Sequence, residues 1–176
     1  MAAPRHDGSS IRLAPELAVL LHQLDESYER KAWHGPNLKG SIRGLTVEQV
    51  AWRPSPARHS IVEHVIHAAY WKYAVRRRLR RDERGSFPLR GSNWFAVAPA
   101  PDLAAWKGYV KILETEHRIL RDAVARFPCE KLFDLAEGGK VTNLMLISGI
   151  ASHDVYHAGQ IQLLKRLQDS GKPRTA

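Results

Sequence analysis

The chain of 176 residues has little of what several protein classes require. Its single cysteine, Cys129, cannot form an internal disulfide, so the fold must rely on its apolar core. Charged residues or histidine interrupt every apolar segment before the roughly 18 residues that a membrane-spanning helix needs. The first 20 residues lack the charged start, long apolar run and small-residue cleavage site of a signal peptide. These features exclude a disulfide scaffold and predict a cytoplasmic protein that does not enter membranes.

Acidic residues are in the minority. Lysine and arginine number 27 against 18 aspartates and glutamates, which gives a net charge of +9. The positive charge gathers in one run, RRRLRRDERG at residues 76–85, where cations complement the dipole of a predicted helix end and solvate the exposed turn. No helix-turn-helix, zinc-finger, RRM or KH signature accompanies the run. We therefore expect no specific binding to nucleic acid, while binding of an anionic small molecule stays open.

Strand patterns are absent as well. Four segments place apolar residues at helical spacing, and they predict helices over about residues 13–33, 60–81, 102–127 and 144–167. Gly35 and Pro36 end the first helix, and a long connection with one short helical turn, at 46–50, leads to the second. The pattern predicts an all-α fold, a four-helix bundle with a long connection between helices one and two.

The size of the chain predicts one domain. We expect a single helical domain over residues 1–176 with flexible termini at 1–11 and 169–176. The segment before the third helix is rich in glycine, proline and aromatic residues, which indicates a loop folded onto the surface rather than a free linker. For a small bundle, the assembly that we favour is a homodimer through exposed helix faces.

The stretch HDVYHAGQIQLLK, residues 153–165, places His153 and His157 on the apolar face of the last helix. Their spacing stacks the two rings about 6 Å apart, a separation at which both can reach one metal ion. The pair alone is equally compatible with two hydrogen-bonded core histidines. A third ligand must come from another helix. His67 is the best candidate, His64 could serve instead, and His117 is the next choice.

Three neutral imidazoles suit zinc, nickel, iron or copper, and they leave a position for water or substrate.

Two motifs carry a resemblance to a known family. WRPSPARHSIVEHVIHAAYWKYAVRRRL, at residues 52–79, together with HDVYHAGQIQLLK resembles the DinB-like superfamily of four-helix metalloproteins over about residues 13–167. The resemblance implies a metal site of His67, His153 and His157, with zinc, nickel or iron as the ion. It does not place a ligand at His64, and Gln160 belongs to the typical continuation after His157.

The resemblance implies enzymes of more than one kind that act on small molecules. One interpretation is an S-transferase that uses a low-molecular-weight thiol. The alternatives are a hydrolase that uses a metal-bound hydroxide and a bundle that binds metal without catalysis. Glu63, one turn from His67, is the candidate for proton transfer, whereas Asp154 is expected to be solvated or to support the helix.

Two other metalloprotein classes fit the sequence poorly. A zincin needs glutamate directly after the first histidine of the pair, and Asp154 occupies that position. A ferritin-like di-iron protein needs two E-x-x-H motifs and two further inward glutamates. Glu114 and His117 supply one motif, and Asp154 with His157 supplies only a shortened second.

Overall fold

The computed structural model describes residues 13–98 and 100–170, apart from the side chain of residue 170. Over these residues the chain forms helices and no strand, which confirms the all-α prediction. The long helices are α1 (Pro15–Tyr28), α4 (Ile61–Arg80), α5 (Leu103–Ala125) and α6 (Asn143–Ser170), and the short ones are α2 (Leu38–Ser41), α3 (Val47–Ala51) and the 3-10 turn η1 (Cys129–Lys131). None of the described helices combines the length and apolarity needed to cross a membrane. Residues 1–11, predicted to be flexible, lie outside the described residues, whereas α6 includes 169 and 170.

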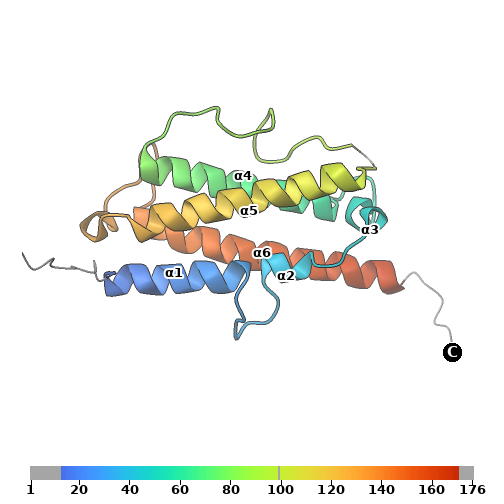
Figure 1. The fold of residues 1–176 in the computed structure, drawn as a ribbon, viewed down its shortest axis with the longest axis horizontal. Coiled ribbons are helices and arrows are strands. Elements are labelled where there is room, and N and C mark those ends of the chain that lie inside the picture. Colours follow the sequence, from blue (N-terminus) through green and yellow to red (C-terminus); the bar gives the residue numbers. More distant parts are fainter. Residues whose placement is uncertain (1–12, 99, 171–176) are drawn as a thin grey trace, which may run out of the picture.

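The four long helices lie lengthwise beside one another (Figure 1). α4 packs along α5, and α6 packs against both α1 and α4. The predicted long connection between α1 and α4 is present and carries α2 and α3. A second long connection, residues 81–102, returns along the length of the bundle, so α4 and α5 point in the same direction (Figure 1). The sequence predicts a surface loop there but not its return along the bundle.

The ends of α1 and α4 follow from local chemistry. The Glu63 carboxylate accepts hydrogen bonds from the backbone N–H and the hydroxyl of Ser60, which fixes the first turn of α4. Arg81 ends α4 in the left-handed conformation, with φ of 58°. α1 ends five residues earlier than the predicted residue 33, because the N–H groups of residues 29 and 30 both donate to the carbonyl of Asp25.

The core has an apolar cluster toward each end and a polar layer between them. On α5 and α6, the apolar stretches that belong to the two clusters are separated by buried polar residues. α4 faces this layer with buried polar side chains of its own. The polar layer consists of His64, His67, Lys72 and Arg76 from α4, Glu116 and His117 from α5, and Asp154 and His157 from α6. Burial of so many polar groups costs free energy unless each one finds a partner, so their contacts indicate where the function lies.

Candidate metal centre

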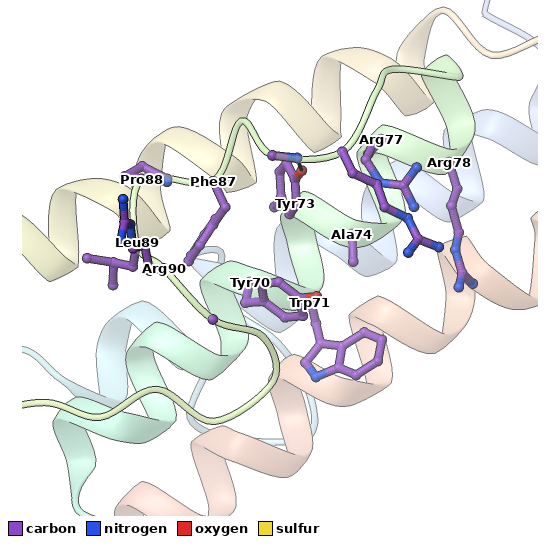
Figure 2. A pocket seen from close by; sticks show the side chains of 13 residues that line it. Tyr70, Trp71, Tyr73, Ala74, Arg77, Arg78, Phe87, Pro88, Leu89 and Arg90 are labelled. Carbon is purple, nitrogen blue, oxygen red and sulfur yellow. Dashed lines mark hydrogen bonds between the residues drawn. The ribbon is translucent and has the colours of Figure 1, made fainter.

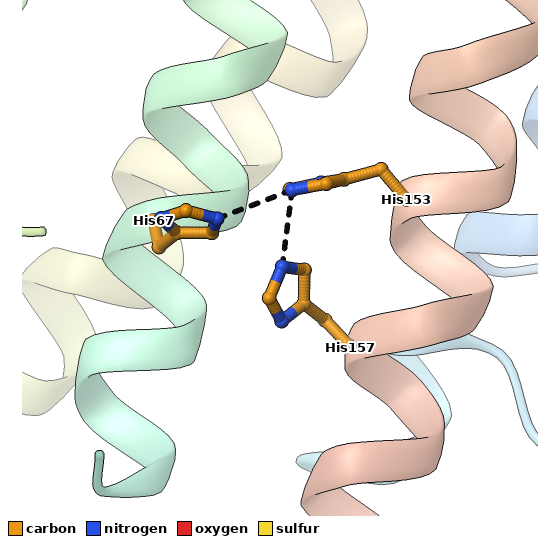
Figure 3. Close-up of side chains that lie close together, drawn as sticks. All are labelled: His67, His153 and His157. Carbon is orange, nitrogen blue, oxygen red and sulfur yellow. Dashed lines mark hydrogen bonds between the residues drawn. The ribbon is translucent and has the colours of Figure 1, made fainter. Parts of the chain in front are cut away.

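Three histidines of the two packed helices α4 and α6 converge at one point (Figure 3). The Nε2 atom of His153 lies 3.1 Å from Nε2 of His67 and 3.0 Å from Nε2 of His157. One ring nitrogen from each residue can be chosen so that all three lie within 4.8 Å of one another. Among the described residues this is the one group of histidine, cysteine and acidic side chains close enough to hold a metal ion.

Helix geometry explains the convergence. His153 and His157 are one turn apart on α6, so their side chains project from the same face, as Figure 3 shows. His67 projects toward them from the facing side of α4. His67 and His157 are buried, whereas His153 is partly exposed. The grouping of these three residues agrees with the sequence prediction.

The other ring nitrogens of two of these histidines are held by neighbours. Nδ1 of His67 donates to the backbone carbonyl of Asn93 at 3.0 Å, which leaves Nε2 of a neutral ring with a lone pair. Nδ1 of His157 lies 2.9 Å from Nδ1 of His64. His64, left open as a ligand by the sequence, therefore contacts His157 on the side away from the convergence point. Such contacts orient metal-binding histidines.

Loop 81–102 supplies the cover of the centre. Its Trp94 ring stacks on His67 with centroids 3.9 Å apart and planes inclined by 17°. Trp94 also stacks on His59, at 3.6 Å. The side chain of Asn93 accepts a hydrogen bond from the indole N–H of Trp71 at 3.1 Å, which ties the loop to α4. Asn93 thus contacts His67 through its backbone and Trp71 through its side chain.

Burial keeps these histidines neutral. Loss of solvation lowers the pKa of His153 to about 4 and that of His157 to about 2, and the neighbouring histidines add to both shifts. Burial also lowers the pKa of His67, and it lowers that of His64 to about 4. All four rings are therefore unprotonated near neutral pH. A neutral imidazole is the form that binds a metal.

The hydrogen bonds of neutral rings cannot satisfy this arrangement. His67 presents a lone pair at Nε2, so its contact with His153 needs a proton on Nε2 of His153. The same His153 nitrogen also contacts Nε2 of His157, and one nitrogen cannot donate and accept in the ring plane at once. A cation that accepts all three lone pairs removes the conflict. The donor set thus fits a divalent transition metal such as zinc, nickel or iron.

Asp154 is not solvated, contrary to one of the two roles expected for it. The residue is fully buried, and its carboxylate accepts a hydrogen bond from the ammonium group of Lys72, which is also fully buried. Burial raises the pKa of Asp154 to about 6 and lowers that of Lys72. The pair links α4 to α6 directly beside His153. Lys72 was not predicted as a site residue, although it is the one lysine, arginine, aspartate or glutamate between Glu63 and Arg76.

His117 contacts the buried pair of Lys72 and Asp154 and does not belong to the metal centre. Its Nδ1 lies 3.3 Å from the ammonium nitrogen of Lys72, and its ring stacks on Tyr28 at 3.7 Å. Burial and the charge of Lys72 lower the pKa of His117 to about 2. Glu114, the partner of His117 in the E-x-x-H motif, is partly exposed and pairs with Lys39. These positions do not form the inward carboxylate and histidine set of a di-iron site.

Glu63 lies at the start of α4 and has several partners there. Besides its two bonds from Ser60, its carboxylate forms an ion pair with Arg53 at 2.8 Å and contacts His59 at 3.2 Å. Burial alone raises the pKa of Glu63, but these hydrogen bonds and the Arg53 charge outweigh it and hold the pKa below its usual range. A carboxylate held ionised by so many donors is suited to support the helix end more than to transfer a proton.

A pocket of about 480 Å³ opens beside the centre. His157 and His64 form part of its wall. Tyr156, next to His157 in the chain, and Gln160, about one turn further along α6, add polar groups. Most of the remaining lining is apolar and comes from Trp94 and the leucines at the end of α6. The full lining is Pro54, Ser55, Arg58, His59, His64, Trp94, Tyr156, His157, Gln160, Leu163, Leu164 and Leu167. A small molecule bound there would contact a residue of the convergent triad.

Comparison with known proteins identifies the family. A search of curated proteins and a search of solved structures each gave no significant match. The family model described as the DinB superfamily matches residues 32–161, which include all three convergent histidines, the whole of α4 and α6 as far as Ile161. The match covers well over half of the chain, and it agrees with the all-helical fold. The chain therefore belongs to the DinB superfamily.

Proposed function

We propose that the protein is a metal-dependent enzyme that binds one divalent ion through His67, His153 and His157. Zinc or nickel is the preferred ion, and iron is the alternative. The observation that carries the proposal is the contact of one His153 nitrogen with two others, at 3.1 and 3.0 Å, among rings that burial keeps neutral. When bound, such an ion supplies a Lewis acid that favours the ionised form of a thiol or a water molecule.

The chain orients two of the three ligands before an ion arrives. The Asn93 carbonyl fixes the proton of His67 on Nδ1, and His64 holds the ring of His157 through its outer nitrogen. Trp94 covers the His67 ring and excludes water from that side. Preorganised ligands of this kind favour catalysis because little reorganisation is needed when the substrate binds.

The 480 Å³ pocket is the proposed substrate site. Its apolar lining suits a small and largely apolar electrophile, and Gln160 and Tyr156 can donate hydrogen bonds to a polar group on it. Of the described residues, Arg58 lines the pocket and no aspartate or glutamate does. A substrate with a carbonyl or a carboxylate group fits these donors better than a cationic one.

The thiol in the proposed reaction comes from outside the chain. Cys129 lies in the turn η1 and does not belong to the histidine group, and its sulfur lies 3.5 Å from a carboxylate oxygen of Glu16. Partial burial, and then the contact with Glu16, raise the pKa of the Cys129 thiol. A thiol with a raised pKa is a poor nucleophile at neutral pH. We therefore propose a low-molecular-weight thiol as the second substrate of an S-transferase.

The test is a panel of electrophiles and of esters, each assayed with and without an added thiol on the metal-loaded protein. We expect an electrophile to react faster when the thiol is present, and His153→Ala to lower this thiol-dependent rate by about a hundredfold or more. Cys129→Ser is the matched control and should keep the full rate. Metal-dependent ester hydrolysis that ignores the thiol would replace the transferase by a hydrolase. Inactivity in every assay would favour a metal-binding bundle without catalysis.

A further inference from the structure

The arginine-rich run at the end of α4 divides into two groups. Three of its arginines pair with carboxylates. Arg76 contacts Glu116 at 2.8 Å, and Asp82 and Glu137 are the partners of the others, Arg80 and Arg81. The other three, Arg77, Arg78 and Arg84, form no ion pair with any described carboxylate, and they line one pocket. The role of a charged helix end accounts for the paired arginines, but it does not account for the three unpaired arginines that line one pocket.

This pocket lies between α4 and loop 81–102 and has a volume of about 510 Å³ (Figure 2). Arg77 and Arg78 lie side by side at one end of it, and Arg90 lies at the other end beside Pro88 (Figure 2). Aromatic residues line the pocket between these ends: Tyr70, Trp71, Tyr73 and Phe87. The hydroxyl of Tyr73 accepts a hydrogen bond from the N–H of Gly85 at 3.0 Å, which fixes the loop over α4.

Among the residues that the structure describes, no acidic side chain lines this pocket to balance its charge. Four arginines line it, Arg90 included. Arg77 spends one donor on the backbone carbonyl of Asp82, at 3.4 Å, and its remaining donors are available. Like charges gathered around one cavity repel each other, and an anion relieves this repulsion. Guanidinium groups bind phosphate and carboxylate through paired hydrogen bonds, so arginine suits this task better than lysine.

The aromatic residues define the rest of the ligand. Tyr70, Trp71 and Phe87 are only partly buried, so parts of their rings are available to a ligand. Flat ligand rings stack on such side chains, and arginine planes add to the stacking. We propose that this pocket binds a small molecule in which an aromatic ring carries a phosphate or carboxylate group. The anionic group binds at Arg77, Arg78 and Arg84, and the ring lies along the aromatic residues of α4.

The pocket shares one residue with the surroundings of the histidine centre. Trp71 lines the pocket, while its ring lies 6.3 Å from that of His67 and 6.4 Å from that of His153. Its indole N–H also donates to Asn93, which holds His67. A ligand in the pocket therefore contacts the residue next to the centre, and the indole fluorescence of Trp71 should report its binding.

Calorimetric titration with four probes tests the proposal. AMP and 2-naphthoate carry both a ring and an anionic group, adenosine lacks the charge, and inorganic pyrophosphate lacks the ring. We expect AMP or 2-naphthoate to bind at least about tenfold more tightly than either incomplete probe. Whichever of the two binds better identifies the anionic group as phosphate or carboxylate. Binding of neither at millimolar concentration, or equal binding of adenosine, would overturn the proposal.

Matched double variants separate the pocket from general positive charge. Arg77→Gln with Arg84→Gln should weaken binding by about tenfold or more. Arg80→Gln with Arg81→Gln removes the same charge from the same segment but outside the pocket, and it should change binding less than about twofold. Equal losses of affinity in the two variants would show that the ligand is attracted by general positive charge, and this would contradict the proposed pocket. Trp71→Phe should keep binding while it removes most of the fluorescence change.

Two further measurements exclude other binding modes. His153→Ala should leave the affinity for the preferred probe unchanged, because the anion is held by arginines and not by a metal ion. Loss of binding in His153→Ala would move the ligand to the histidine centre and overturn the proposal. Single-stranded oligonucleotides should bind no more tightly than AMP, whatever their length. Affinity that rises steeply with oligonucleotide length would assign the surface to nucleic acid instead.

Discussion

His64 and His67 lie almost one turn apart on α4, yet their nitrogens contact different partners. His67 presents Nε2 to His153, whereas His64 contacts the outer nitrogen of His157. The spacing in the sequence cannot separate these roles, because both residues face the bundle interior. What separates them is the backbone carbonyl of Asn93, which holds His67 from a loop far away in the chain. A backbone atom leaves no trace in a side-chain pattern, so the sequence predicts the histidines but not what orients them.

Metal content distinguishes a ligand from a residue that orients one. We expect His67→Ala, His153→Ala and His157→Ala each to lose most of the metal that purifies with the protein. His64→Ala should keep at least half of it, with an affinity lowered by about 10- to 100-fold because His157 loses its partner. Elemental analysis gives the content, and competition with a chelator gives the affinity.

His117→Ala is the control for these variants, since His117 is buried in the same layer but contacts Lys72. Its metal content and affinity should match those of the unmodified protein. Full metal content in His67→Ala, together with loss in His64→Ala, would move the third ligand by one turn of α4.

At the scale of the helices, the patterns of the sequence predict well what depends on local spacing. The predicted range 60–81 corresponds to α4 at Ile61–Arg80, and 102–127 corresponds to α5 at Leu103–Ala125. The return of loop 81–102 along the bundle depends on tertiary packing, and so does the pairing of Lys72 with Asp154 across two helices. An interior lysine and an interior aspartate 82 residues apart carry no joint signal in one sequence.

The Lys72 and Asp154 pair fixes how α4 and α6 face each other. Lys72→Met leaves the Asp154 carboxyl buried without its partner, and we expect a loss of about 3 kcal/mol in the free energy of unfolding. Lys72→Met combined with Asp154→Leu removes both charges and should recover most of that loss. Denaturant unfolding at neutral pH measures both variants.

The double variant also tests a link to the histidine centre. Asp154 directly follows His153, so an apolar replacement of the pair removes a polar constraint on the rotation of α6. We expect the double variant to be stable but to bind metal more weakly than the unmodified chain. Unchanged stability in Lys72→Met would mean that the pair contributes nothing, and unchanged metal affinity in the double variant would mean that packing alone positions His153.

At the scale of the whole molecule, unbalanced positive charge and neutral histidines are separated in space, because the buried cations Lys72 and Arg76 are paired with Asp154 and Glu116. The net charge of +9 is carried by the surface and by the arginine pocket, while the bundle interior holds histidines whose pKa is lowered. Protonation of the interior would add positive charge to a chain that already has an excess. Acid should therefore lower the stability of this protein mainly through its buried histidines and less through groups on its surface.

The pH dependence of stability follows from the sign of these shifts. His64, His117, His153 and His157 have folded-state pKa values of about 4, 2, 4 and 2, below the roughly 6.5 of an unfolded histidine. Between these values the unfolded chain binds more protons, so the stability that is present above about pH 6.5 is lost as the pH falls. Asp154 acts in the opposite direction, because burial raises its pKa to about 6, but it is one group against four.

We therefore expect the melting temperature of the metal-free protein to fall steadily from about pH 7 to about pH 5. The free energy of unfolding should decrease by on the order of 1 kcal/mol per pH unit for each uncompensated histidine. His117→Phe should flatten this dependence, because it removes one buried titrating ring that lies outside the metal centre. Bound metal competes with protons for the triad and should steepen it. Thermal unfolding followed by circular dichroism across this range gives all three curves. A melting temperature that stays level or rises on acidification would show that folding does not lower the pKa of the interior histidines, and the argument that burial keeps the triad neutral would then be wrong.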